Sequence, residues 1–321
     1  MKALDSPVLI SYQGSAAAFT PKADSTYVLA ESIEDRSRHS ALWEKRCENT
    51  MFASITEQSL SAFNAYVEGS ESKYLLRSRQ SLSLFVKRLR RHRVYLDITG
   101  LNHSTWAALL RMMLSSCIEV IVVYVEPRDY RPSGIPTEGT IFDLSERIQG
   151  VSPLPGFISL RQPRQEKTCF VPMLGFEGAR FSYALEQVQP LPEKIVPIVG
   201  VPGFKAEYPF HAYLGNRTAL TESQSWRNVR FAAANCPFSL FYLLREIHGE
   251  YAEHTLKLAP IGTKPHALGA VLYAISRAQL GPVELVYDHP IRKKGRTEGT
   301  GRLLAYDVWK LIQHFGFIED D

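Results

Sequence analysis

The stretch Leu256–Gly269, LKLAPIGTKPHALG, leads from a short apolar run through a Gly-Thr-Lys-Pro turn into an apolar-periodic segment. The run predicts a buried strand, and the segment that continues to Ile275 predicts a helix. Where a parallel strand leads directly into a helix, backbone N–H groups at the helix start and a nearby lysine favour an anion. The turn is not a P-loop, which has four residues between its first glycine and Gly-Lys-Ser/Thr. The sequence therefore predicts a nucleotide-like, phosphate-bearing ligand, bound by Gly262, Thr263, Lys264 and His266.

The composition is that of an ordinary globular protein. The chain has 321 residues, of which 45% are hydrophobic and 22% charged, enough for a well-formed core and up to two domains. Its net charge of +4 is mild for this length. Basic residues nevertheless cluster in two runs, Lys87–Arg93 and Arg292–Arg296. Each run is either a solvated face or a contact for nucleic acid or another polyanion.

Cysteine usage and apolar runs bear on the compartment. The four cysteines lie far apart, without a Cys-x-x-Cys pair, which predicts reduced thiols. No histidine stands near them at metal-ligand spacing, so we expect no metal site. Asp5 interrupts any signal peptide, and apolar runs such as the one within Ile118–Val125, which Glu119 interrupts, have the length of a strand and are too short to span a bilayer. We therefore expect a cytoplasmic protein without membrane contact, and the sequence indicates no particular cofactor.

From Val94 onward, predicted strands and helices alternate. The expected strands cover residues 94–99, 118–125, 169–174, 195–199, 256–261 and 283–287. Repeated strand–helix–strand units with right-handed crossovers predict one mainly parallel sheet with helices on both faces. The expected fold is therefore α/β, a doubly wound Rossmann-like sheet, in which ligands bind beyond the carboxyl ends of the strands. Residues 91–321 are predicted to form this nucleotide-binding domain.

Residues 1–90 are predicted to form an N-terminal α/β region, either separate or part of the same fold. One internal echo links this region to the rest of the chain. Residues 27–36 and 170–180 both read as a strand, an acidic residue, an arginine and the start of a helix. The echo leaves open that the chain consists of two related α/β halves.

Three carboxylates are candidate catalytic residues, because each directly follows a predicted strand: Asp97, Glu126 and Glu177. A carboxylate at such a place can act as a general base, bind a ribose hydroxyl or cap the next helix. Since the strands are expected to run the same way, we expect these residues and Lys264 at one edge of the sheet.

Further candidates for ligand binding lie beside these carboxylates: Thr99, Gly100, Tyr124, Arg180 and Tyr287. The ring of Tyr124 could stack on a base. Arg180 lies one helical turn after Glu177 and could pair with it or with a phosphate. Tyr287 ends the last strand, before a basic, glycine-rich loop at residues 293–302. This loop either closes over a ligand or is an ordinary surface loop.

The Ile-Gly-Thr-Lys-Pro-His turn at residues 261–266 resembles the signature of CRISPR-associated Rossmann-fold sensors, in which Gly-Gly-Thr-Lys follows a strand. Here Ile261 replaces the first glycine. The resemblance implies a cyclic oligonucleotide made during antiviral signalling as the ligand. More broadly, residues 97–301 look like Rossmann-like proteins of bacterial defence loci, where Asp-Ile-Thr, Tyr-x-Glu-Pro, Gly-Phe-Glu and Gly-Thr-Lys-Pro turns each close a strand. This likeness implies ligand-site roles for Asp97, Glu126, Glu177 and Lys264.

Three functions are compatible with these patterns. The first is a nucleotide-binding sensor or regulatory subunit in bacterial antiviral defence, which signals to a partner protein. The second is an enzyme that hydrolyses or modifies a nucleotide or related phosphorylated metabolite, with a carboxylate as general base. The third is a structural subunit of a nucleic-acid-binding complex, held by the basic runs. A nucleophile triad is not supported, because no Gly-x-Ser-x-Gly elbow is present. The absence of a recognised effector domain favours the first.

Overall fold

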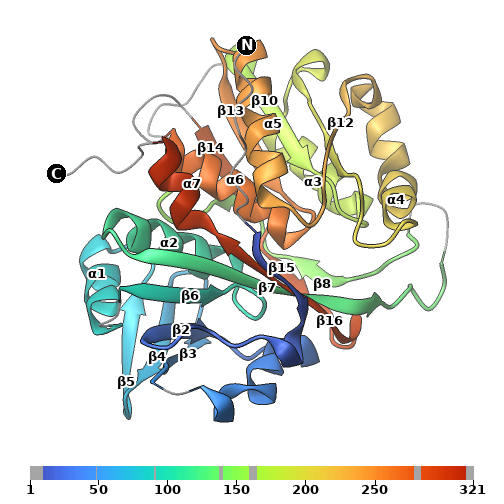
Figure 1. The fold of residues 1–321 in the computed structure, drawn as a ribbon. Helices are drawn as coiled ribbons and strands as arrows, with labels where there is room; N and C mark the ends of the chain where they lie inside the picture. Colours follow the sequence, from blue (N-terminus) through green and yellow to red (C-terminus); the bar gives the residue numbers. More distant parts are fainter. Residues whose placement is uncertain are drawn as a thin grey trace. The chain divides into compact units, whose positions relative to one another are not determined.

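The computed structural model describes residues 10–47, 49–89, 92–136, 140–158, 165–277 and 283–315. Its contacts divide the chain into two compact units. Unit 1 comprises residues 1–129 and 297–321, and unit 2 comprises residues 130–296. Both units combine strands and helices, so the α/β class is confirmed (Figure 1).

Unit 1 is built on an eight-stranded mixed sheet with the order β1-β16-β7-β6-β2-β3-β4-β5. Its strands are β1 (Ile10–Ser15), β2 (Ser25–Leu29), β3 (Met51–Glu57), β4 (Ala62–Val67), β5 (Ser70–Leu75), β6 (Arg93–Asp97), β7 (Glu119–Tyr130) and β16 (Thr297–Asp307). The four central strands β3, β2, β6 and β7 run parallel. The pairs β3–β4, β4–β5 and β1–β16 are antiparallel.

The helices of unit 1 include α1 (Arg79–Arg88), α2 (His103–Ser115) and α7 (Val308–Phe315), with short 3₁₀ helices η1 (Ala16–Ala18), η2 (Asp35–Leu42) and η3 (Glu44–Arg46). Helix α1 is capped by Ser78, whose hydroxyl accepts a hydrogen bond from the Ser81 backbone N–H. Strand β2 is buried along its whole length, as expected for a strand in the middle of a covered sheet. Aromatic rings fill the space beside it, with Trp43 4.9 Å from Tyr27 between ring centres.

Unit 2 is built on a six-stranded sheet with the order β12-β11-β10-β13-β14-β9. Unit 2 as a whole contains the strands β8 (Ser145–Ile148), β9 (Ser152–Pro153), β10 (Thr168–Met173), β11 (Ile198–Gly200), β12 (Arg230–Ala232), β13 (Thr255–Pro260), β14 (Val283–Tyr287) and β15 (Pro290–Arg292). Five strands run parallel, and β9 is antiparallel to β14. Strands β8 and β15 form a separate antiparallel ribbon.

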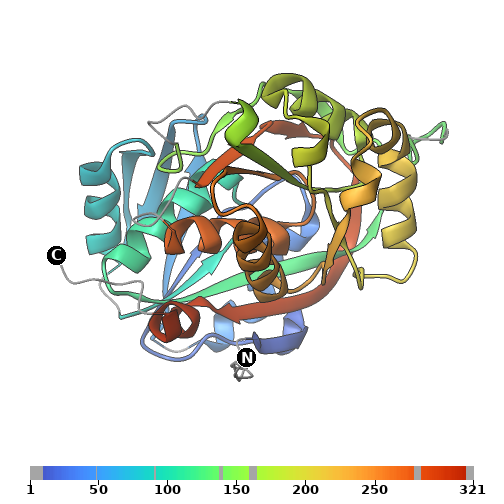
Figure 2. The same ribbon diagram turned by 90° about the horizontal axis from the view of Figure 1, so that it is seen from above.

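The helices of unit 2 include α3 (Gly178–Val188), α4 (Tyr208–Glu222), α5 (Pro237–Glu250) and α6 (Lys264–Ser276), with 3₁₀ helices η4 (Gln165–Lys167), η5 (Pro192–Lys194) and η6 (Ser225–Asn228). Helix α3 packs against α4, and α5 packs against α6. In Figure 2, α3 and α6 lie on opposite sides of the sheet. Numbered in chain order, the five parallel strands follow the order 3-2-1-4-5, so the chain reverses its direction of travel between β10 and β13.

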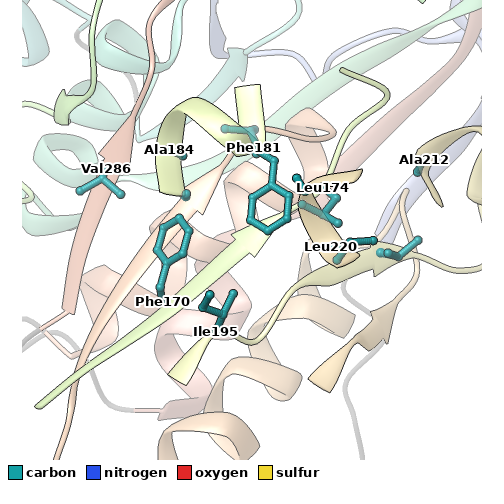
Figure 3. Packing of buried hydrophobic residues seen from close by; sticks show 12 residues of the cluster. Phe170, Leu174, Phe181, Ala184, Ile195, Ala212, Leu220 and Val286 are labelled. Atoms are coloured by element: carbon teal, nitrogen blue, oxygen red, sulfur yellow. The ribbon is translucent and has the colours of Figure 1, made fainter. Parts of the chain in front are cut away.

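One buried cluster joins α3 to the sheet of unit 2. Phe181 and Ala184 of α3 pack with Phe170 of β10, and Ile195 and Leu220 belong to the same cluster (Figure 3). Burying one such phenylalanine contributes roughly 1.5–3 kcal/mol. This packing fixes the start of α3 at the carboxyl end of β10.

All six expected strands are present, within a few residues at either end, but the single sheet is wrong. Strands β6 and β7 belong to unit 1, whereas β10, β11, β13 and β14 belong to unit 2. Periodicity indicates where a strand lies and not which strand it pairs with, and β6 pairs with the early strand β2. The expected boundary at residues 90/91 falls inside unit 1, because β2 and β6 share one sheet.

Candidate functional site

The carboxyl ends of β10 and β13 meet at the reversal point of unit 2. The two strands are paired with Met173 opposite Pro260. The turns that follow them approach so closely that a side chain does not fit at either glycine. A Cβ added at Gly175 would lie 2.9 Å from the Ile261 oxygen, and one added at Gly262 would lie 2.6 Å from the Leu174 oxygen. Gly262 therefore has a packing role at the predicted turn, beside any role in ligand binding.

The start of α6 combines a capped helix end with backbone donors. Thr263 caps the helix by accepting from the His266 N–H at 3.3 Å, and its hydroxyl donates to the Ala234 oxygen at 2.8 Å. Within the described part of the chain, the backbone N–H groups of Gly262 and Thr263 have no acceptor. Lys264, only 7% exposed, is the first residue of the helix. A backbone with these donors and a lysine can hold an anion.

His266 lies fully buried beneath this turn. Its Nε2 is 3.1 Å from the Ala233 oxygen, so the ring ties α6 to the turn after β12. Burial lowers the pKa of His266 to about 4, and the ring is therefore uncharged at neutral pH. The contacts assign His266 a structural role in place of the predicted ligand contact.

Arg180 pairs with an acid that the sequence analysis did not name. Its Nε and Nη2 donate to the two oxygens of Asp288 at 2.6 and 2.7 Å, and its Nη1 donates to the Ile261 oxygen at 2.9 Å. Burial lowers the pKa of Arg180, but Asp288 more than offsets this, so the pKa stands above its ordinary value. Tyr287 places its ring 5.8 Å from the guanidinium. Arg180 thus fastens α3 to the ends of β13 and β14.

Glu177 has a different partner from the one expected. One of its oxygens accepts from the backbone N–H groups of Leu144 and Ser145, both at 2.8 Å, and the other accepts from the Ser145 hydroxyl at 2.8 Å. The nearest Arg180 nitrogen is 4.0 Å away. The carboxylate therefore anchors the start of β8 at α3, a geometry that gives no support to a general-base role.

In unit 1, Asp97 belongs to a fully buried polar cluster at the end of β6. One carboxylate oxygen accepts from the Thr99 N–H at 2.8 Å, and the other lies 3.8 Å from His39 Nε2. The same nitrogen is 2.9 Å from the Tyr27 hydroxyl. Burial, with the nearby Asp97, raises the pKa of Tyr27 well above its usual value. Among the described residues, the second Asp97 oxygen has no hydrogen-bond donor.

The other unit 1 candidates are also engaged in packing. The Thr99 hydroxyl accepts from the Val125 N–H at 3.0 Å. A Cβ added at Gly100 would lie only 1.8 Å from the Ala30 oxygen, so this position too needs a glycine. Tyr124 is buried, which leaves its ring no surface on which a base could stack.

Glu126 lies within β7 instead of after it. Its carboxylate accepts from Arg302 Nε of β16 at 2.7 Å. This hydrogen bond raises the pKa of Arg302. As with Glu177, the contacts hold two elements together and do not favour proton transfer.

The predicted common edge for Asp97, Glu126, Glu177 and Lys264 is wrong, because the residues follow strands of two different sheets. Asp97 and Glu126 lie in unit 1, and Glu177 and Lys264 lie in unit 2. Each pair lies toward the carboxyl ends of the parallel strands of its own sheet.

Residues that the sequence analysis did not single out complete the edge of unit 2. Asp288 and His289 directly follow β14, and Ser152 of β9 lies opposite Tyr287. The rule applied to the other strands, that site residues follow strand ends, could have found the first two. The contact of Ser152 with His289 follows only from the antiparallel pairing of β9 with β14.

Several side chains of the basic runs are tied to protein groups. Arg88 donates to the Ser72 and Tyr74 hydroxyls, and Arg93 pairs with Glu119 at 2.9 Å. Lys293 pairs with Asp143. Arg90 and Arg91 lie outside the described residues. These contacts give the runs a structural use.

Three further features concern the chain as far as the structure describes it. Its helices include none with both the length and the apolar character needed to cross a membrane. It contains no group of three or more His, Cys, Asp or Glu side chains arranged to hold a metal ion. All four cysteines are free thiols.

The chain matches no protein-family model. It also has no significant match among curated proteins.

Proposed function

We propose that unit 2 is a doubly wound, Rossmann-like domain that binds a nucleotide-like ligand where β10 and β13 end. The strand order β12-β11-β10-β13-β14 carries this proposal. In open α/β sheets, ligands bind outside the carboxyl ends of the strands at the point where the strand order reverses. The reversal in unit 2 lies between β10 and β13, and the predicted turn at Gly262 is on one side of it.

The chemistry of this turn favours a phosphate. The N–H groups of Gly262 and Thr263 lie at the start of a 13-residue helix, whose dipole attracts a negative charge. Lys264 adds a positive charge at a place where the same dipole disfavours it by about 0.3–1 kcal/mol. A bound phosphate offsets that cost and accepts hydrogen bonds from the turn.

A binding role suits this site better than catalysis by a carboxylate. Glu126 holds Arg302, and Glu177 holds the backbone of Leu144 and Ser145. We therefore propose a sensor or regulatory subunit that recognises a nucleotide and signals to a partner protein. The resemblance of the turn to defence-associated sensors suggests bacterial antiviral signalling as its setting and a cyclic oligonucleotide as its ligand.

Calorimetric titration with adenosine mononucleotides and cyclic oligoadenylates tests the proposal. We expect Lys264→Ala to weaken binding roughly 10- to 150-fold, the equivalent of one charge-assisted phosphate contact of about 1.5–3 kcal/mol. The matched control is Lys257→Ala, which removes a lysine from the middle of β13, 3.5 Å from Glu284. Equal affinity of wild type and Lys264→Ala, with a lowered melting temperature in the variant, would assign Lys264 to structure instead.

A further inference from the structure

A serine and a histidine form a close pair at the outer strands of unit 2. Ser152 on β9 lies opposite Tyr287, the last residue of β14. Its Oγ is 2.9 Å from Nε2 of His289, two residues further along the chain. The serine is half-buried and the histidine is 6% exposed. A hydroxyl within hydrogen-bond reach of an imidazole is the geometry of an activated nucleophile.

The backbone holds His289 in an unusual conformation. Its φ is +45°, in the left-handed region that non-glycine residues adopt uncommonly, with asparagine, aspartate and histidine the most frequent among them. Strain of this kind clusters at functional sites. The preceding residue is held firmly, because both oxygens of Asp288 accept from Arg180. The ring of Tyr287 lies 5.2 Å from the imidazole at nearly a right angle.

The electrostatics leave the imidazole able to accept a proton. Burial lowers the pKa of His289, while Asp288 and a hydrogen bond with the Ser152 backbone act in the opposite direction. The ring is therefore uncharged at neutral pH and has one nitrogen with a free electron pair. When that nitrogen is Nε2, the serine hydroxyl donates to it.

We propose that Ser152 is a nucleophile, with His289 as its general base, toward a phosphate ester of the ligand. The substrate class rests on the proposed function. Strand spacing of about 4.8 Å puts β9 roughly 10 Å from β13, within the span of a nucleotide anchored at the α6 turn. In the first step the Oγ–P bond forms, the bond from phosphorus to the leaving oxygen breaks, and the serine proton passes through His289 to that oxygen. Water then attacks the phosphoserine and gives up its proton to His289, which returns it to the serine oxygen as the Oγ–P bond breaks.

A fluorophosphonate probe tests the pair directly. Attack by Ser152 forms an Oγ–P bond, releases fluoride and transfers the proton to His289. We expect labelling of the wild type at Ser152, located by peptide mass spectrometry, and none at this site in Ser152→Ala. His289→Asn should label at least about 100-fold more slowly, because a general base contributes roughly 10²- to 10⁴-fold. Asparagine suits this position, since it tolerates a left-handed backbone.

The matched control is Ser145→Ala, which removes a hydroxyl that bonds a carboxylate instead of an imidazole. This variant should label like the wild type. For the wild type, the rate should be constant at neutral pH and fall in acid as His289 is protonated, a measurement that does not depend on the folding of any variant.

Folded wild-type protein that does not react would overturn the inference and leave the Ser152–His289 bond a brace between β9 and β14. Wild-type labelling at a different serine instead of Ser152, unchanged in Ser152→Ala, would overturn it as well. The probe carries no nucleotide, so labelling without nucleotide binding counts against the proposed function alone. Nucleotide binding without labelling counts against the serine nucleophile alone.

Discussion

The two units place an arginine at the same point of a similar topology and surround it differently. In unit 1 the parallel strand order reverses beside β2, and in unit 2 it reverses beside β10. Arg36 follows β2 and donates to the Tyr124 hydroxyl at 3.0 Å and the Val125 oxygen at 2.6 Å, both in β7. Arg180 follows β10 and donates to the Ile261 oxygen and to Asp288, after β13 and β14. Each arginine thus connects to strands, or to the turns that follow them, on the far side of its reversal point.

The two reversal points differ in the sign of the charge beside the turn. In unit 1 the neighbouring strand β6 ends in Asp97, which lies with His39 and Tyr27 in a fully buried cluster. In unit 2 the neighbouring strand β13 leads to Lys264 and to backbone donors without acceptors at Gly262 and Thr263, as far as the chain is described. One backbone arrangement therefore supports an internal polar cluster in one unit and, in the other, a turn with a lysine and backbone donors, for which we propose an anion as the ligand.

Removal of either arginine should have the largest effect. Arg36→Ala leaves Glu34 buried without its 2.6 Å partner, and Arg180→Ala does the same to Asp288. Breaking a buried ion pair typically costs 3–5 kcal/mol, and we expect about that loss of unfolding free energy in each variant, measured by urea denaturation. A loss well below 1 kcal/mol in only one variant would break the parallel between the two arginines.

The second largest effect should come from acidification, which we expect to destabilise unit 2 through His266. The folded pKa of His266, about 4, lies below its unfolded value near 6.5, so the unfolded state binds more protons between these values. Stability contributed by the neutral ring is present above pH 6.5 and is lost as the pH falls toward 4, by about 2–4 kcal/mol in total. Hydrogen exchange should show unit 2 opening in this window, and His266→Gln should abolish that part of the pH dependence. Identical pH profiles in wild type and variant would contradict the assignment.

The smallest effect on stability should come from alanine at Gly100 in unit 1 and at Gly175 in unit 2, two glycines that lie close to a neighbouring backbone. The added Cβ lies 1.8 Å from the Ala30 oxygen in Gly100→Ala and 2.9 Å from the Ile261 oxygen in Gly175→Ala. Overpacking typically costs 1–3 kcal/mol, so we expect about 3 kcal/mol for the first variant and about 1 kcal/mol for the second. Thermal melting measures both. Equal losses of stability in the two variants would mean that the backbone around Gly100 shifts to make room for a Cβ as easily as the backbone around Gly175.

The comparison of the two units shows where the similar segments 27–36 and 170–180 lie in the fold. Both segments contain the strand beside which the order reverses, followed by an arginine that reaches across the reversal. The sequence pattern alone contained the strand, the acid and the arginine. It did not contain the partners Tyr124 and Asp288, which lie 88 and 108 residues away.

Local signals were sufficient for the strands, for the start of α6 and for the lysine at its first turn. Apolar β-branched runs and capping residues act over a few neighbours, and a sequence displays them directly. The hydrogen-bond partners of the carboxylates could not be predicted in this way. Both glutamates follow the pattern of site residues. The Glu126 carboxylate, however, accepts from Arg302, and the Glu177 carboxylate accepts from the backbone of Leu144 and Ser145.

The sequence by itself determined that this chain is α/β, that strands lie near residues 94–99 and 256–261, and that a glycine–threonine–lysine turn opens α6. Only the tertiary structure decided that these strands belong to two sheets, that Asp97 and Lys264 lie in different units, and that Ser152 faces His289. The physical reason is the separation along the sequence over which each interaction acts. Backbone propensity and capping depend on residues within about one helical turn, whereas strand pairing and buried ion pairs depend on partners that only the folded chain brings together.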